Sequence, residues 1–133
     1  MDAALRAFVR ERAGHCCEYC HLHEADAGRL SFQIEHIIAK QHGGTDDSET
    51  LCYSCPQCNW AKGPNLAGLS GGKLYPLFNP RKQSWNRHFR WEQTVLVGKT
   101  KTGIVTVQVL SINDPARVML RENLLFEGRF PPE

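Results

Sequence analysis

Hydrophobic and polar residues follow two different periods in the first half of the chain. Apolar residues recur at helical spacing over 3–13, which predicts an amphipathic helix. Over 30–34 apolar and polar residues alternate instead, which predicts a half-buried strand. A second short strand over 49–53 and a helix beginning at Cys58 follow. This half of the chain is therefore expected to be a helix, two strands and another helix.

The second half carries weaker signals of the same two kinds. Residues 62–72 are rich in glycine and proline and predict an ordered connection. Asn79-Pro80 and Asp114-Pro115 each place a capping residue before proline, which predicts two helix starts. The alternation over 104–110 predicts the clearest strand of the chain, paired with 94–97 through a turn.

The length of 133 residues fits one compact domain. No stretch is long and apolar enough to span a membrane, and charged residues interrupt the N-terminal segment where a signal peptide would need an apolar run. We therefore expect a cytoplasmic protein that does not engage a membrane.

Charge is unevenly distributed along the chain although the net charge is only +2. Residues 18–49 contain seven acidic and two basic side chains, whereas residues 73–101 contain seven basic and one acidic. An acidic segment that attracts metal ions beside a basic one suits an enzyme that cuts a polyanion, although uneven surface charge is also common in proteins without that function.

The six cysteines form two clusters within the first 58 residues. In a cytosolic chain, cysteines at such spacing are more often metal ligands than disulfides. Cys17-x2-Cys20 and Cys55-x2-Cys58 have the spacing of two zinc knuckles, and four thiolates would leave no open position on the ion. Cys16 in place of Cys17, or the overlapping pair Cys52-x2-Cys55, would satisfy the spacing equally well.

Several spaced features between residues 17 and 63 resemble the HNH endonuclease family: Ile34-Glu35-His36-Ile37-Ile38, His42-Gly43-Gly44, Leu51, Cys55-x2-Cys58-Asn59 and Lys62-Gly63. A weaker resemblance to compact bacterial HNH proteins continues through Leu77-Phe78-Asn79-Pro80-Arg81 to His88-Phe89. The resemblance favours Cys17, Cys20, Cys55 and Cys58 as the zinc ligands.

The resemblance implies a ββα-metal fold that holds one divalent cation. In that family His36 would be the general base, because an imidazole near its ordinary pKa can take a proton from water at neutral pH. Glu35 and Asn59 fall at the metal-binding positions, and oxygen ligands of this kind suit Mg²⁺ or Mn²⁺. Lys62 would hold a neighbouring phosphate.

Two residues depart from the family pattern. Glu35 stands where the family often has aspartate, and its extra methylene can be absorbed by a flexible metal shell. Thr50 stands where the family has the central asparagine that braces the loop and orients the histidine. A threonine hydroxyl makes fewer hydrogen bonds than an amide, so we expect weaker bracing at an active site. The backbone carbonyl of Thr50 would remain available to the imidazole.

These observations predict an α+β protein: a small ββα-metal core with a four-cysteine zinc site over 14–65, and an extension over 66–133 containing a β-hairpin and helices, in a single domain over 1–133. Trp85, Phe89 and Trp91 are expected to pack in the core rather than stack on bases.

The expected function is a metal-dependent DNA endonuclease with little sequence specificity, acting on double-stranded, nicked or single-stranded DNA. His42 in the Gly-Gly loop, and Arg81 and Arg87 in the basic segment, are candidate contacts to the nucleic acid besides Lys62. Two alternatives remain: a zinc-stabilised nucleic-acid-binding module without catalysis, and a zinc-containing protein-interaction domain. The sequence does not indicate the oligomeric state.

Overall fold

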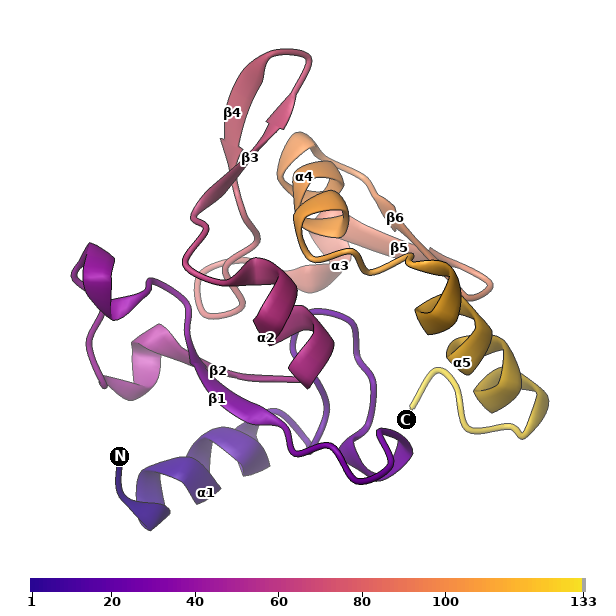
Figure 1. The fold of residues 1–133 in the computed structure, drawn as a ribbon, viewed down its shortest axis with the longest axis horizontal. Coiled ribbons are helices and arrows are strands. Elements are labelled where there is room, and N and C mark those ends of the chain that lie inside the picture. The colour runs from indigo at the N-terminus through magenta and orange to yellow at the C-terminus, as the bar shows by residue number, and fades with distance from the viewer. Residues whose placement is uncertain (133) are drawn as a thin grey trace.

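The computed structural model describes residues 1–132 and consists of short helices and three two-stranded antiparallel sheets (Figure 1). Its elements, in chain order, are α1 (Ala3–Arg12), η1 (Glu24–Asp26), β1 (Gln33–His36), η2 (Lys40–His42), η3 (Ser48–Thr50), β2 (Leu51–Ser54), α2 (Pro56–Lys62), β3 (Ala67–Ser70), β4 (Lys73–Pro76), α3 (Trp85–His88), β5 (Phe89–Glu92), β6 (Val95–Gly98), α4 (Lys101–Val109) and α5 (Pro115–Phe126).

The N-terminal half contains the expected two strands followed by a helix. Strand β1 pairs antiparallel with β2, with Glu35 opposite Cys52 and His36 opposite Leu51. Helix α1, capped by the Asp2 side chain, packs on this hairpin, and α2 contacts β1 from another side (Figure 1). The first residue of α2 is proline, which has no backbone N–H. The N–H of a first helical residue would have no partner within the helix, so proline is well suited to begin α2 directly after β2.

Helix α4 organises the C-terminal half by contacting both β3 and β6. The close approach of α4 to β6 and to the end of α3 requires glycine at positions 98 and 103. A Cβ on Gly98 would lie 2.3 Å from the backbone nitrogen of Ile104, and one on Gly103 would lie 2.1 Å from the carbonyl oxygen of His88. The turn end of hairpin β3–β4 projects beyond the rest of the protein (Figure 1).

The strand expected over 104–110 is wrong, because this segment is helix α4. Its β-branched residues favour a strand, but tertiary packing overrides that preference. Thr100 caps the helix by accepting from the Gly103 amide (3.0 Å), and buried Thr106 donates to the Thr102 carbonyl (2.6 Å). Strand β6 consequently pairs with β5 rather than with this segment.

Two further expectations need correction. Residues 62–72 are not only a connection, because β3 begins within them and forms a hairpin with β4. Asn79-Pro80 does not start a helix: the Asn79 side chain accepts from the Arg81 amide (2.9 Å) in a local turn, and α3 begins only at Trp85.

Other expectations are confirmed with small shifts in their bounds. The strand expected over 30–34 begins at Gln33 and contains His36. Asp114 caps α5 as expected. Trp85 and Phe89 pack together, with ring centroids 5.2 Å apart. None of the described helices is long and apolar enough to cross a membrane.

Candidate metal centre and catalytic groove

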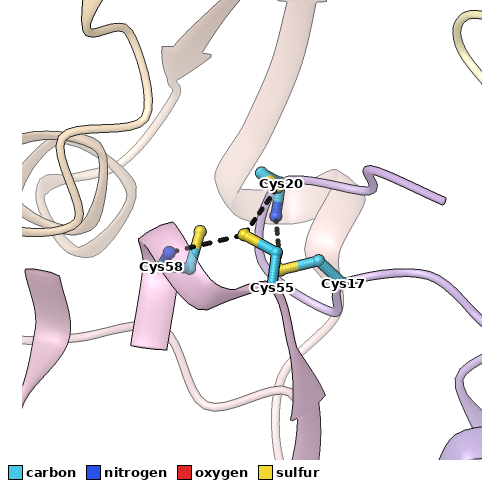
Figure 2. A group of neighbouring side chains, drawn as sticks. All are labelled: Cys17, Cys20, Cys55 and Cys58. Carbon is cyan, nitrogen blue, oxygen red and sulfur yellow. Dashed lines mark hydrogen bonds between the residues drawn. The ribbon is translucent and has the colours of Figure 1, made fainter. Parts of the chain in front are cut away.

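Four buried cysteine sulfurs gather where the loop after α1 meets the N-terminus of α2 (Figure 2). The sulfurs of Cys17, Cys20, Cys55 and Cys58 all lie within 4.8 Å of one another. Four sulfurs about 2.3 Å from a zinc ion would form a tetrahedron with edges of about 3.8 Å. Cys20 and Cys55 are already 3.7 Å apart, so the cluster fits a structural zinc ion.

Each cysteine pair is shaped by its own backbone. The Cys20 amide points at the Cys17 sulfur (3.5 Å), and the Cys58 amide points at the Cys55 sulfur (3.4 Å), as dashed lines in Figure 2 show. Cys16 is only half-buried and lies outside the cluster, whereas the Cys52 sulfur faces Glu35. Of the three pairings compatible with the spacing, the structure brings together the sulfurs of the one that the sequence analysis favoured, and the sulfurs of Cys16 and Cys52 from the two alternatives lie elsewhere.

The protonation of the thiols depends on the metal. Burial raises the pKa of the Cys17 and Cys58 thiols well above their usual range, while hydrogen bonds from Cys17 and the other thiols hold the pKa of Cys20 well below it. Without a cation the cluster therefore retains protons, and a zinc ion has to displace them.

Arg117 connects the C-terminal half to this centre. Its guanidinium lies 3.0 Å from the Cys58 sulfur and 3.8 Å from the Cys55 sulfur, and also donates to the Leu110 carbonyl (2.8 Å). A cation at this position partly offsets the negative charge of four thiolates. Arg117 therefore links α5 and the end of α4 to the cysteine cluster.

Glu35 is buried, and neighbouring polar side chains fix the position of its carboxylate. Its Oε2 accepts from the Tyr19 hydroxyl (2.8 Å) and from the Cys52 thiol (3.1 Å). Burial raises the pKa of both Tyr19 and Cys52, so both groups stay protonated and can donate. The Lys62 ammonium lies 3.1 Å from Oε1 without the alignment of a hydrogen bond, and donates to the Ile37 carbonyl (3.0 Å).

His36 is bound to an acidic residue of the following loop. Its Nε2 lies 2.7 Å from Oδ1 of Asp46, and the ring is about one-quarter exposed. Hydrogen bonds from His36 and Lys40 hold the pKa of Asp46 below its usual value, so this carboxyl is ionised at neutral pH. In the neutral ring, a carboxylate acceptor favours the tautomer with the proton on Nε2, which leaves the lone pair on Nδ1.

A single groove of about 470 Å³ brings the catalytic candidates together. Glu35, His36 and Asn59 all line it, so strand β1 and helix α2 contribute to the same surface. Lys40 and Trp60, which the sequence analysis did not select, complete its wall together with Gly63 and Pro64.

Thr50 lies at the base of the loop rather than in the groove. Its hydroxyl donates to the Asp47 carbonyl (2.7 Å) and the Thr45 carbonyl (3.0 Å), so it braces the loop that carries Asp46. Its own carbonyl accepts from the Ile37 amide (3.0 Å), and the described partner of the imidazole is Asp46. The expected contact between the Thr50 carbonyl and His36 is therefore absent among the described residues, and the Asp46 side chain contacts the imidazole instead.

The four nucleic-acid candidates differ in accessibility. Lys62 is buried against Glu35, which corrects the expectation that its ammonium faces a phosphate, and Arg81 is paired with Glu18. His42 and Arg87 are exposed, but neither lines the groove. Lys40 is the lysine that the groove presents to solvent: 63% of its side chain is exposed, and its ammonium lies 3.3 Å from Oδ1 of Asp46.

Sequence reasoning missed Asp46, Arg117 and the pair Tyr19 and Cys52. Asp46 could have been noticed as an acid in the loop that the family uses to orient its histidine. The other three carry no local signal, because their partners lie between 16 and 62 residues away.

Comparison with known proteins identifies a relative of this chain and a family to which its N-terminal half is similar. Over 123 residues the chain is 25% identical to the Septu protein PtuB of Bacillus thuringiensis, an alignment that covers 91% of this chain and 46% of that protein. The chain thus spans about half the length of this curated relative. No solved structure matches this chain significantly. Residues 17–65, which include all four cysteines and the groove residues from β1 and α2, match the model of the HNH endonuclease family, and this part of the chain belongs to that family.

Proposed function

We propose that the protein is a metal-dependent endonuclease that hydrolyses phosphodiester bonds in DNA. The observation that carries this proposal is the shared groove: an imidazole, a carboxylate and an amide line one open space beside an exposed lysine. A nuclease needs a base and a set of oxygen ligands close enough to act on one phosphate.

His36 acts as the general base in this proposal. In the neutral ring Asp46 would favour the proton on Nε2, so that Nδ1 would accept a proton from the attacking water. Asp46 is a positioning residue, since it fixes the tautomer and the orientation of the ring. Thr50 supports it indirectly by bracing the loop between Thr45 and Asp47.

Glu35 and Asn59 are the residues that would hold a catalytic cation. The test of fit is Glu35 Oε1, a buried oxygen of a groove-lining residue that accepts no hydrogen bond within residues 1–132. A carboxylate and an amide that line the same groove are oxygen ligands of the kind that suits Mg²⁺ or Mn²⁺. When bound, such a cation would polarise the phosphate and stabilise the leaving oxygen. Tyr19, Cys52 and Lys62 hold the carboxylate in place.

The remaining features of the proposal concern the substrate. Lys40 is the groove's exposed cation and would contact a phosphate next to the scissile one. The groove presents no array of base-reading side chains among residues 1–132, which favours little sequence specificity. We expect the protein to act in the cytoplasm and residues 1–133 to fold as one domain.

The test is cleavage of supercoiled plasmid with Mg²⁺ or Mn²⁺ by wild type and His36→Ala. We expect nicking by wild type and at least a loss of about a hundredfold in the variant, the scale of general-base catalysis. His15→Ala, a histidine outside the groove, is the matched control and should retain activity. Equal activity of wild type and His36→Ala would refute the proposal, provided that both contain zinc.

A zinc-stabilised nucleic-acid-binding module without catalysis is the alternative. The close approach of the Lys62 ammonium to Glu35 Oε1 favours this alternative. The ammonium and a catalytic divalent cation would compete for the same carboxylate oxygen. This function predicts salt-dependent DNA binding that Glu35→Ala leaves unchanged, with no nicking in any divalent metal.

A further inference from the structure

Trp60 is an exposed indole beside the catalytic groove. Of the surface of this residue, 89% is accessible, although tryptophan is usually well buried. The other two tryptophans pack against aromatic neighbours in the C-terminal half. Within residues 1–132 no aromatic ring or guanidinium stacks on Trp60 itself. Both faces of its ring system are therefore available to a ligand.

The geometry of α2 explains why this side chain points outward. Cys58 and Lys62 lie four residues apart on the buried face of the helix. Asn59 is turned about 100° from Cys58 and reaches the groove, and Trp60 is turned about 100° further, away from the protein. The indole therefore stands at the edge of the groove, one residue from the proposed cation ligand.

We propose that Trp60 is a stacking platform for an unpaired nucleobase next to the scissile phosphate. This inference rests on the proposed function and adds a substrate class: single-stranded or locally unwound nucleic acid. Inside a duplex both faces of each base are covered by neighbouring bases, so an indole can stack only on a base that has left the helix. Lys40 on the same groove supplies the charge that would hold the adjoining backbone.

Continuity with the groove distinguishes this role from a protein-docking role. Trp60 lines the same space as His36 and Asn59, so a partner protein seated on the indole would cover the site that must admit the substrate. A nucleobase on the indole would instead help to place the neighbouring phosphate in the groove.

The experiment measures binding in a His36→Ala background, which prevents cleavage. The probes are a labelled single-stranded oligonucleotide of about 20 nucleotides and a blunt duplex of the same sequence. We expect Trp60→Ala to weaken binding of the single strand about tenfold and of the duplex less than about twofold, and Trp60→Phe to restore most of the loss. Phe126→Ala removes an equally exposed aromatic (93% accessible) outside the groove and should change neither affinity.

Fluorescence gives a second measurement on the same proteins. Trp60 is the most exposed of the three tryptophans, so the single strand should quench a component of the emission that Trp60→Phe lacks. Unchanged binding in Trp60→Ala, as for a protein-docking residue, would overturn the inference, and so would an equal loss for single strand and duplex. Either result leaves the proposed function intact if wild type cleaves and His36→Ala does not; a wild type without cleavage refutes the proposed function whatever Trp60 does.

Discussion

At the scale of single residues, the site depends on side chains that hold other side chains. His36 is positioned by Asp46, and Glu35 is positioned by a buried tyrosine, thiol and ammonium. Neither group of contacts is assigned to the substrate in the proposed function. Their contributions can be separated by substitutions that keep the shape and remove the charge.

Asp46→Asn keeps a hydrogen-bond acceptor near His36 but removes the negative charge that favours one tautomer. We expect kcat to fall by roughly 10- to 100-fold with little change in KM, since general-base catalysis as a whole contributes about 10²- to 10⁴-fold. Steady-state cleavage of an oligonucleotide measures both constants. Asp47→Asn is the matched control, because that carboxylate faces the Glu49 amide and asparagine can replace it there. An equal effect of both substitutions would contradict a specific role for Asp46.

Lys62→Met leaves the buried Glu35 without its ammonium. We expect the free energy of unfolding to fall by about 3 kcal/mol, because an unpaired buried charge is costly. The double variant with Glu35→Gln should recover much of this loss. Denaturation in urea measures both. Lys40→Met, a change on an exposed side chain, should cost less than about 1 kcal/mol. A Lys62→Met protein as stable as wild type would show that the pair contributes nothing.

At the scale of elements, α5 is attached to the zinc centre through one arginine. Arg117→Met should lower zinc affinity by about 10- to 100-fold, the usual effect of removing a residue that contacts metal ligands. Competition with a chromogenic chelator measures the affinity. Arg10→Met removes an arginine paired with Glu24 on the surface and is expected to leave zinc binding unchanged. If the two variants retain zinc equally, α5 is not coupled to the centre.

The elements that could be predicted from sequence are those fixed by local chemistry. The capping residue and proline of α5 specify where that helix starts, whereas α2 begins two residues before the predicted Cys58. The cysteine spacing together with the family resemblance indicates which four sulfurs come together. Helix α4 could not be predicted, because its valines and threonines favour a strand and only its packing on β3 and β6 selects the helix. The buried position of Lys62 was also inaccessible, since it depends on where Glu35 lies in the folded chain.

At the scale of the whole molecule, zinc binding should depend on pH. The raised pKa of the Cys17 and Cys58 thiols means that zinc must displace their protons, so zinc affinity rises with pH and falls in acid. We expect about a tenfold change per pH unit for each displaced proton. Zinc affinity measured at about pH 6, 7 and 8 checks this slope. A flat profile would indicate that the thiols are already ionised without metal.

Helix α2 carries Cys58 on its inner face and Asn59 and Trp60 at the next two positions. The cysteine cluster lies at the start of this helix, so the shape of the groove would depend on a zinc ion that has no role in the proposed hydrolysis. Hydrogen peroxide, which attacks thiolates, is therefore expected to abolish the proposed nuclease activity although the proposed reaction uses no sulfur, and a reductant together with added zinc is expected to restore it.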